Sequence, residues 1–183
     1  MKCKSVSIIV LASGITLAAA ACSKDKAAQT SASVDTAATT PGGGDHPGQF
    51  LANAVEANNA EIEAGQAATK MGSTKPVRDY GKMLVDDHKK ANDAAKKLAQ
   101  SMNVPVPTGT TTEAQSELKM ATSMSGTGFD KDFVSAMVKD HQKAIEMFQR
   151  EADSGDPAQV TAFAKQTLPT LKKHLQTAQS LNK

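Results

Sequence analysis

The sequence predicts an all-α protein, an antiparallel four-helix bundle with one long crossover connection. Apolar residues recur at steps of three and four residues over four long stretches, which is the spacing of one face of an α-helix. Breaks rich in Gly, Pro, Ser and Thr separate these stretches, and the middle break is the longest. No stretch is a candidate for a strand.

The first two predicted helices form a hairpin. The first covers residues 50–71 and ends at the turn of residues 72–74. The second covers residues 76–102, and Pro76 suits its start because the first turn of a helix needs no backbone donor there. Its apolar residues follow a seven-residue rhythm, which indicates packing against neighbouring helices.

The second pair of helices follows the long connection. This connection begins at residues 104–107 and holds a short predicted helix at residues 113–124. The third long helix covers residues 129–152, and the fourth runs from the break at residues 154–157 to about Leu181. Two short hairpins joined by one crossover are the arrangement of ferritin-like folds, here the crossover between the second and third long helices.

Residues 1–21 are typical of a secretory signal peptide, with two lysines before an apolar run. The run ends in small residues directly before Cys22, which resembles the lipobox of bacterial lipoproteins. The resemblance implies that Cys22 is the lipidated first residue of an exported protein. Ser23, rather than Asp, follows it and favours the outer membrane, facing the periplasm. Ala19 stands where lipoboxes usually carry Leu, so ordinary cleavage with a free Cys22, which would leave the protein periplasmic, stays open.

Residues 22–48 are rich in Ala, Ser, Thr, Gly and Pro and read as a flexible tether. The bundle domain follows at residues 49–183. It contains no cysteine, so its stability must come from packing rather than from disulfides.

The composition argues against several classes of partner. Aromatic residues make up only 3% of the chain, and removing residues 1–21 leaves 19 basic and 19 acidic residues. We therefore expect no nucleic-acid partner and no membrane-active bundle, because both need a basic surface.

Several short segments of the predicted domain occur in an order and at a spacing that are found together in a known protein family. They are Phe50 through Glu61 to Ala67, Val77 to Tyr80 with Asp87 and His88, Gly128 to Asp130, Asp140 with His141, and Leu168-Pro169 with His174-Leu175. Together they resemble a large bacterial family of exported, ferritin-like helical proteins of unknown function, often labelled only as predicted outer-membrane proteins. The resemblance implies a fold and a place in the cell envelope, and it implies no reaction.

Four side chains able to bind a metal fall on the apolar faces of four different predicted helices: Glu61, His88, His141 and His174. With about 1.5 Å of rise per residue, the first three come level near the middle of the bundle. The same count puts His174 about 7 Å or more from their plane, unless a kink at Pro169 brings it closer. These residues are compatible with a mononuclear site for one transition metal ion, zinc, copper or iron, and select none of the three.

The favoured interpretation, however, is that the histidines are buried polar residues, hydrogen-bonded to Glu61 or Asn58, that fix helix register, because buried polar groups need partners whether or not a metal is present. A ferritin-type di-iron centre is excluded, because it needs Glu-x-x-His on two helices. The residues three positions before the histidines are Val85, Val138 and Leu171.

Two helices repeat an Asp-His pair, since residues 80–91 align without gaps on residues 133–144. Adjacent helical residues point about 100° apart. We therefore expect Asp87 and Asp140 to face solvent or a neighbouring lysine rather than the histidines.

No motif of a known enzyme class is present, so we expect no catalytic residues. The first hypothesis is a non-enzymatic envelope lipoprotein that acts in envelope maintenance or stress tolerance through a protein partner. The alternative is a metal-binding or redox protein with a His/Glu site in the middle of the bundle. The oligomeric state is left open.

Overall fold

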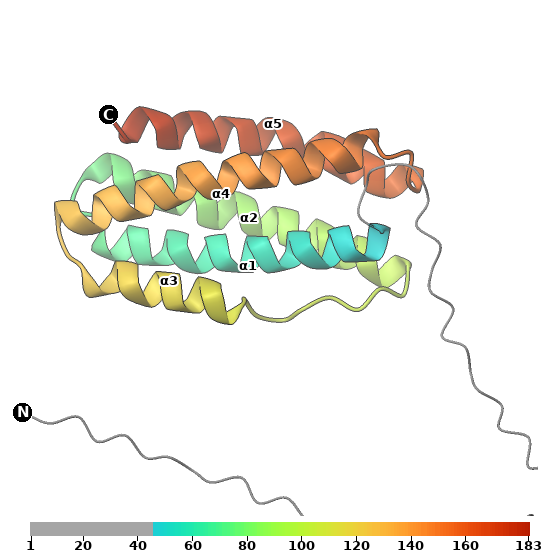
Figure 1. Ribbon diagram of the computed structural model, residues 1–183, viewed down its shortest axis with the longest axis horizontal. Coiled ribbons are helices and arrows are strands. Elements are labelled where there is room, and N and C mark those ends of the chain that lie inside the picture. The colour runs from blue at the N-terminus through green and yellow to red at the C-terminus, as the bar shows by residue number, and fades with distance from the viewer. Residues whose placement is uncertain (1–45) are drawn as a thin grey trace, which may run out of the picture. The chain divides into compact units, whose positions relative to one another are not determined.

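The computed structural model describes residues 46–183, and all five of the helices in this range were predicted (Figure 1). Every observed end lies within three residues of the predicted one, and residues 46–183 contain no strand. The all-α bundle is therefore confirmed. The predicted signal peptide, Cys22 and the tether up to residue 45 lie outside the described residues. The helices are α1 (Pro47–Met71), α2 (Lys75–Ser101), α3 (Thr112–Ser123), α4 (Thr127–Asp153) and α5 (Ala158–Leu181).

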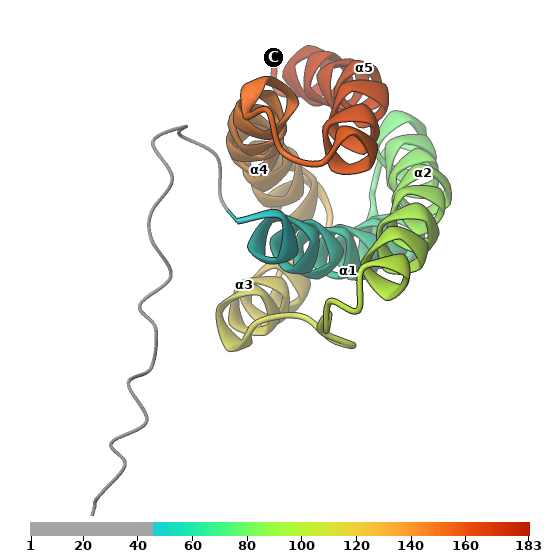
Figure 2. The same ribbon diagram turned by 90° about the vertical axis from the view of Figure 1, so that its right-hand side faces the viewer.

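The four long helices pair as two antiparallel hairpins, α1 with α2 and α4 with α5 (Figure 2). The bundle closes because α2 also packs on α5 and α1 packs on α4. The short helix α3 runs back along the bundle between the end of α2 and the start of α4, outside the four long helices and against α1 and α4. It is the helix of the predicted crossover. None of the helices in residues 46–183 has an apolar stretch long enough to cross a membrane.

Local chemistry explains the largest boundary difference. The helix α1 starts at Pro47 rather than at Phe50, because proline suits the first turn and the Nδ1 atom of His46 accepts a hydrogen bond from the Gly48 backbone amide at 3.3 Å. At the other end of the chain, α5 continues through Pro169 as one helix.

The core consists of two apolar clusters at different heights along the bundle. In the Phe50 cluster, Phe50 meets Phe148 edge-on with ring centroids 5.0 Å apart, and Phe163 packs beside both. In the Phe133 cluster, Phe133 stacks on Phe129 and contacts Tyr80, with both centroid separations at 5.9 Å. On each long helix the predicted metal-binding residue lies between these two clusters.

A carboxylate from α4 holds the turn between α1 and α2. Asp130 accepts hydrogen bonds from the Ser73 amide at 2.8 Å, the Ser73 hydroxyl at 2.6 Å and the Thr74 amide at 3.1 Å. Burial by itself would raise the pKa of Asp130, but these donors hold it below its usual value. The two hairpins are thereby joined at this end of the bundle by polar bonds as well as by packing.

The helices α1 and α2 approach each other most closely at two glycines. A Cβ atom on Gly81 would lie 2.7 Å from the carbonyl oxygen of Gly65 and 2.8 Å from the Cβ atom of Ala68. A Cβ atom on Gly65 would lie 2.7 Å from the carbonyl oxygen of Gly81. Only glycine at both positions allows this approach.

We predict that Gly81→Ala lowers the free energy of unfolding by about 1–3 kcal/mol, because the new methyl group clashes with the backbone of α1. Alanine normally stabilises a helix by about 0.5–1 kcal/mol relative to glycine, so the sign of the change is diagnostic. Gly128→Ala in α4 is the matched control, since only the Met124 Cβ atom, at 3.9 Å, lies near its new methyl group. Urea denaturation measures both variants, and a Gly81→Ala protein as stable as the parent would contradict the close approach.

Candidate metal centre

A layer of buried polar side chains separates the two apolar clusters. It contains Glu61 from α1, His88 from α2, His141 from α4 and His174 from α5. The exposed fraction is 0% for His141 and His174, 3% for His88 and 5% for Glu61. The structure therefore brings together one ionisable side chain from each long helix.

The three imidazole rings face one another, with centroids 5.1 to 5.7 Å apart. One nitrogen from each ring lies within 4.8 Å of the nitrogens offered by the other two. The closest pair is His141 Nε2 and His174 Nδ1, at 3.2 Å. The Oε2 atom of Glu61 contacts His88 Nε2 directly and lies 3.3 Å from His141 Nε2. We call His88 Nε2, His141 Nε2 and His174 Nδ1 the inner nitrogens, and Glu61 Oε2 the Glu61 oxygen.

The expectation that His174 lies about 7 Å or more out of the plane is wrong. That count assumed that the end of α4 and the start of α5 lie at the same height along the bundle. The rings of His141 and His174 nevertheless meet, so either the two helix ends are offset along the bundle or α5 departs from a straight axis, and a count of helical rise includes neither. As a result His174 joins the other three side chains.

The other nitrogen of each ring faces a hydrogen-bond acceptor. His141 Nδ1 lies 2.9 Å from the Met137 carbonyl oxygen, and His88 Nδ1 lies 2.8 Å from Asn58 Oδ1. His174 Nε2 lies 3.2 Å from Asp87 Oδ2. An oxygen that only accepts requires a hydrogen on the facing nitrogen, so each ring donates outward and turns its second nitrogen inward.

Two of the inner nitrogens, His141 Nε2 and His174 Nδ1, lie within hydrogen-bonding distance of each other. Burial and the nearby His88 lower the pKa of His174 to about 4. Burial also lowers the pKa of His141 below its usual value, against the attraction of Glu61. When both rings are neutral and donate outward, the lone pairs of His141 Nε2 and His174 Nδ1 point at each other across 3.2 Å, an arrangement that a cation between them would stabilise.

The third inner nitrogen, His88 Nε2, lies against the Glu61 carboxylate. Burial by itself would raise the pKa of Glu61, but the charge of His88 lowers it to about 2. Burial by itself would lower the pKa of His88, but the Glu61 carboxylate raises it above its usual value. Glu61 and His88 thus form a buried ion pair.

Residues 27–181 match a family described as a domain of unknown function, DUF4142. The chain belongs to the DUF4142 family. A similar solved structure is the crystal structure of a DUF305 fragment from Deinococcus radiodurans, which is 13% identical over 74% of this chain and 94% of that chain, with a TM-score of 0.67. At this identity the likeness supports the helical fold alone. No curated protein matches the chain.

The two aspartates of the internal repeat occupy different places in this DUF4142 domain. Asp87 contacts Lys90 at 3.2 Å, as expected, but its Oδ2 atom also contacts His174. The expectation was wrong in this respect because the partner comes from α5, which a count along α2 alone does not include. Asp140 contributes to a cavity beside Glu61, and burial together with the Glu61 charge raises its pKa to about 6.

The donor set of the DUF4142 domain does not fit a ferritin-type di-iron centre. Such a centre needs several bridging carboxylates, whereas Glu61 is the one carboxylate that contacts the inner nitrogens among the described residues. The residues one turn before the histidines, Val85, Val138 and Leu171, are apolar. Three imidazoles and one carboxylate suit a single ion.

We predict that Glu61→Ala destabilises the metal-free domain by about 3–5 kcal/mol, because it leaves the buried His88 charge without its partner. Glu63→Ala, on the same helix but outside the layer, should change the free energy of unfolding by no more than about 0.5 kcal/mol. Urea denaturation at pH 7 with a chelator present measures both variants. Equal stabilities would show that the ion pair does not form.

Proposed function

We propose that this DUF4142 domain binds one divalent transition metal ion through Glu61, His88, His141 and His174. One observation carries the proposal. Each of the three rings faces a fixed acceptor with its outer nitrogen, and the Glu61 oxygen lies against the inner nitrogens of His88 and His141. Histidine ligands in metal proteins are oriented by outer acceptors in this way. An ion that binds here displaces the proton of His88 Nε2 to solvent.

Two of the spacings between the proposed ligand atoms fit a tetrahedral ion. Two atoms 3.2 Å apart, such as His141 Nε2 and His174 Nδ1, subtend about 100° at an ion about 2.1 Å from each. The 3.3 Å between Glu61 Oε2 and His141 Nε2 gives nearly the same angle. These two angles are close to tetrahedral, whereas Glu61 Oε2 and His88 Nε2 lie closer together than two ligands of one ion and must separate when the ion displaces the His88 proton. Zn²⁺ is the ion that combines tetrahedral geometry with nitrogen and oxygen ligands most readily. Copper and iron remain in the test because imidazole binds them as well.

The proposed activity is binding rather than catalysis. Four protein ligands fill a tetrahedral shell, whereas catalytic zinc sites keep one position for water or substrate. The ligands are also almost fully buried. Such a site retains its ion, as a storage, sequestering or structural site does.

We predict that residues 23–183, which contain no cysteine, bind one Zn²⁺ per chain. His141→Ala and His174→Ala should each weaken binding by about 100-fold or more, since each removes a ligand. Asp87→Asn should weaken it by about 10–100-fold, because it removes the carboxylate that orients His174. Titration calorimetry, repeated with Cu²⁺ and with anaerobic Fe²⁺, gives the stoichiometry and affinity for each ion.

His46→Ala is the matched control for this experiment, since His46 is exposed and lies outside the layer. It should bind like the parent chain. If the parent binds no ion, or if His46→Ala weakens binding as much as His141→Ala does, the proposal is wrong and the layer serves only to fix the packing of the helices.

We further propose that the domain is held in the cell envelope by a lipid at Cys22 and has a non-enzymatic role there, in envelope maintenance or stress tolerance. The support is the sequence: an apolar run, the small residues before Cys22, and the low-complexity tether that follows. A domain tethered in this way would hold its bound ion near the membrane surface, where a protein partner can contact the domain.

We predict that Cys22→Ser abolishes labelling of the chain by a radioactive fatty acid and moves it from the membrane fraction to the soluble periplasmic fraction. Cys3→Ser, which lies within the predicted signal peptide, should leave labelling unchanged. A parent chain that carries a free thiol at Cys22 and no lipid would instead support ordinary signal cleavage.

A further inference from the structure

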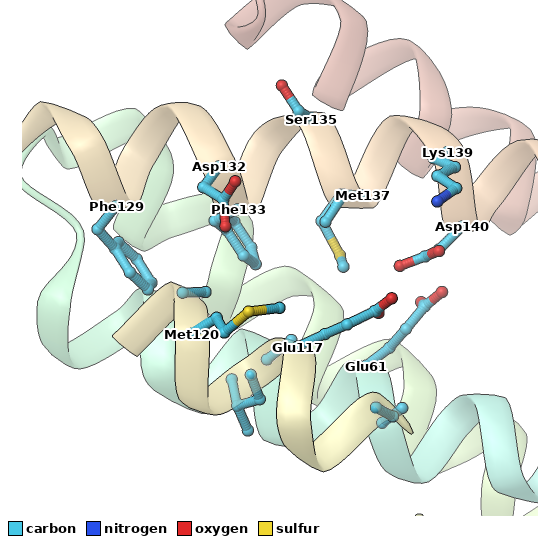
Figure 3. Close-up of a pocket in the computed structure, with 16 residues that line it drawn as sticks. Glu61, Glu117, Met120, Phe129, Asp132, Phe133, Ser135, Met137, Lys139 and Asp140 are labelled. Carbon is cyan, nitrogen blue, oxygen red and sulfur yellow. The ribbon is translucent and has the colours of Figure 1, made fainter. Parts of the chain in front are cut away.

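A cavity lies between α3 and the long helices α1 and α4, next to the buried polar layer (Figure 3). It measures about 350 Å³, and a second cavity of about 400 Å³ adjoins it. The two share five lining residues: Ala60, Glu61, Ala114, Glu117 and Asp140. We call the two together the α3 cavity.

Of the four proposed ligands, Glu61 lines both parts of the α3 cavity, and the three histidines line neither. The Oε2 atom of the same Glu61 contacts His88 and lies 3.3 Å from His141 Nε2. This one carboxylate therefore joins the cavity to the inner nitrogens. Figure 3 shows the carboxylates of Glu61, Glu117 and Asp140 close together in the cavity, each from a different helix.

We propose that the α3 cavity is the access route by which the metal ion reaches the inner nitrogens, with Glu61 as the ligand that receives it first. The inference rests on the proposed function. It adds a path and a role for α3, which the binding site itself does not require.

The charge of the cavity suits a cation. Six acidic residues line it, against the two lysines Lys139 and Lys143. A concave, acidic surface raises the local concentration of cations and their association rate. Carboxylate oxygens can also replace the waters of a hydrated ion one at a time as it moves inward.

The helix α3 is suited to act as a cover. None of its residues is fully buried, and Met120 is 62% exposed. The connection that leads into α3 is tied to α1 by a hydrogen bond from Asn59 Nδ2 to the Gly109 carbonyl oxygen, at 2.9 Å. An element with so little buried surface opens locally at a low cost in free energy.

The side of the polar layer away from the α3 cavity is a poorer route for a metal ion. Asp87 is half-buried there and contacts His174. It faces His174 Nε2, the nitrogen that donates outward, so an ion arriving from that side meets an N–H group rather than a lone pair.

The test measures the rates of Zn²⁺ binding and release by stopped flow, on residues 23–183 and on variants of α3. Ala114→Phe places a ring in both parts of the cavity. Association and dissociation rates should both fall by the same factor, on the order of tenfold, because passage then depends on the opening of α3. The equilibrium affinity should stay unchanged. Ser116→Phe, on the exposed side of α3, is the matched control and should leave both rates unchanged.

Glu117→Gln tests the electrostatic part and does not depend on a bulky side chain being tolerated. It should slow association several-fold at low ionic strength and much less at high ionic strength, because salt screens the attraction. Rates that match the parent in both Ala114→Phe and Glu117→Gln, with one Zn²⁺ still bound, would overturn the route and leave the binding site standing. Absence of Zn²⁺ binding by the parent chain would overturn both.

Discussion

The contact between the Glu61 carboxylate and the imidazole of His88 is the interaction on which the rest of the structure depends. It places a charged pair in the middle of the bundle, between two clusters of apolar side chains. Removing such groups from water costs free energy, which their hydrogen-bond and ion-pair partners offset. The partners come from all four long helices, so the polar layer fixes their relative heights, while the Phe50 and Phe133 clusters exclude water on either side.

The same sequence pattern serves two purposes within this layer. Asp87 and Asp140 each precede a histidine in the repeated segments, yet Asp87 orients His174 while Asp140 faces the α3 cavity. The difference arises from their neighbours: α2 packs on α5, and α4 lies beside α3. An internal repeat therefore does not imply a repeated function, because the chemistry of a side chain depends on the helix that it meets.

Most of the fold could be predicted from the sequence because its signals are local. Apolar periodicity and breaks at Gly and Pro fixed the helices, and helical rise alone brought Glu61, His88 and His141 level. His174 was misplaced because a count of helical rise includes neither the relative heights of two helix ends at a turn nor the path of a helix that contains proline. The contact of Asp87 with α5 and the bonds of Asp130 to the α1–α2 turn also join distant segments, so no local pattern reveals them.

The central claim is that three inner nitrogens and one carboxylate oxygen surround a single ion. X-ray absorption at the zinc edge, on residues 23–183 loaded with one equivalent of Zn²⁺, tests it most directly. The account predicts four light-atom ligands at about 2.0–2.1 Å, with the multiple scattering of three imidazoles, and loss of one imidazole in His174→Ala. A shell of six oxygens, or an imidazole signal unchanged in His174→Ala, would contradict it.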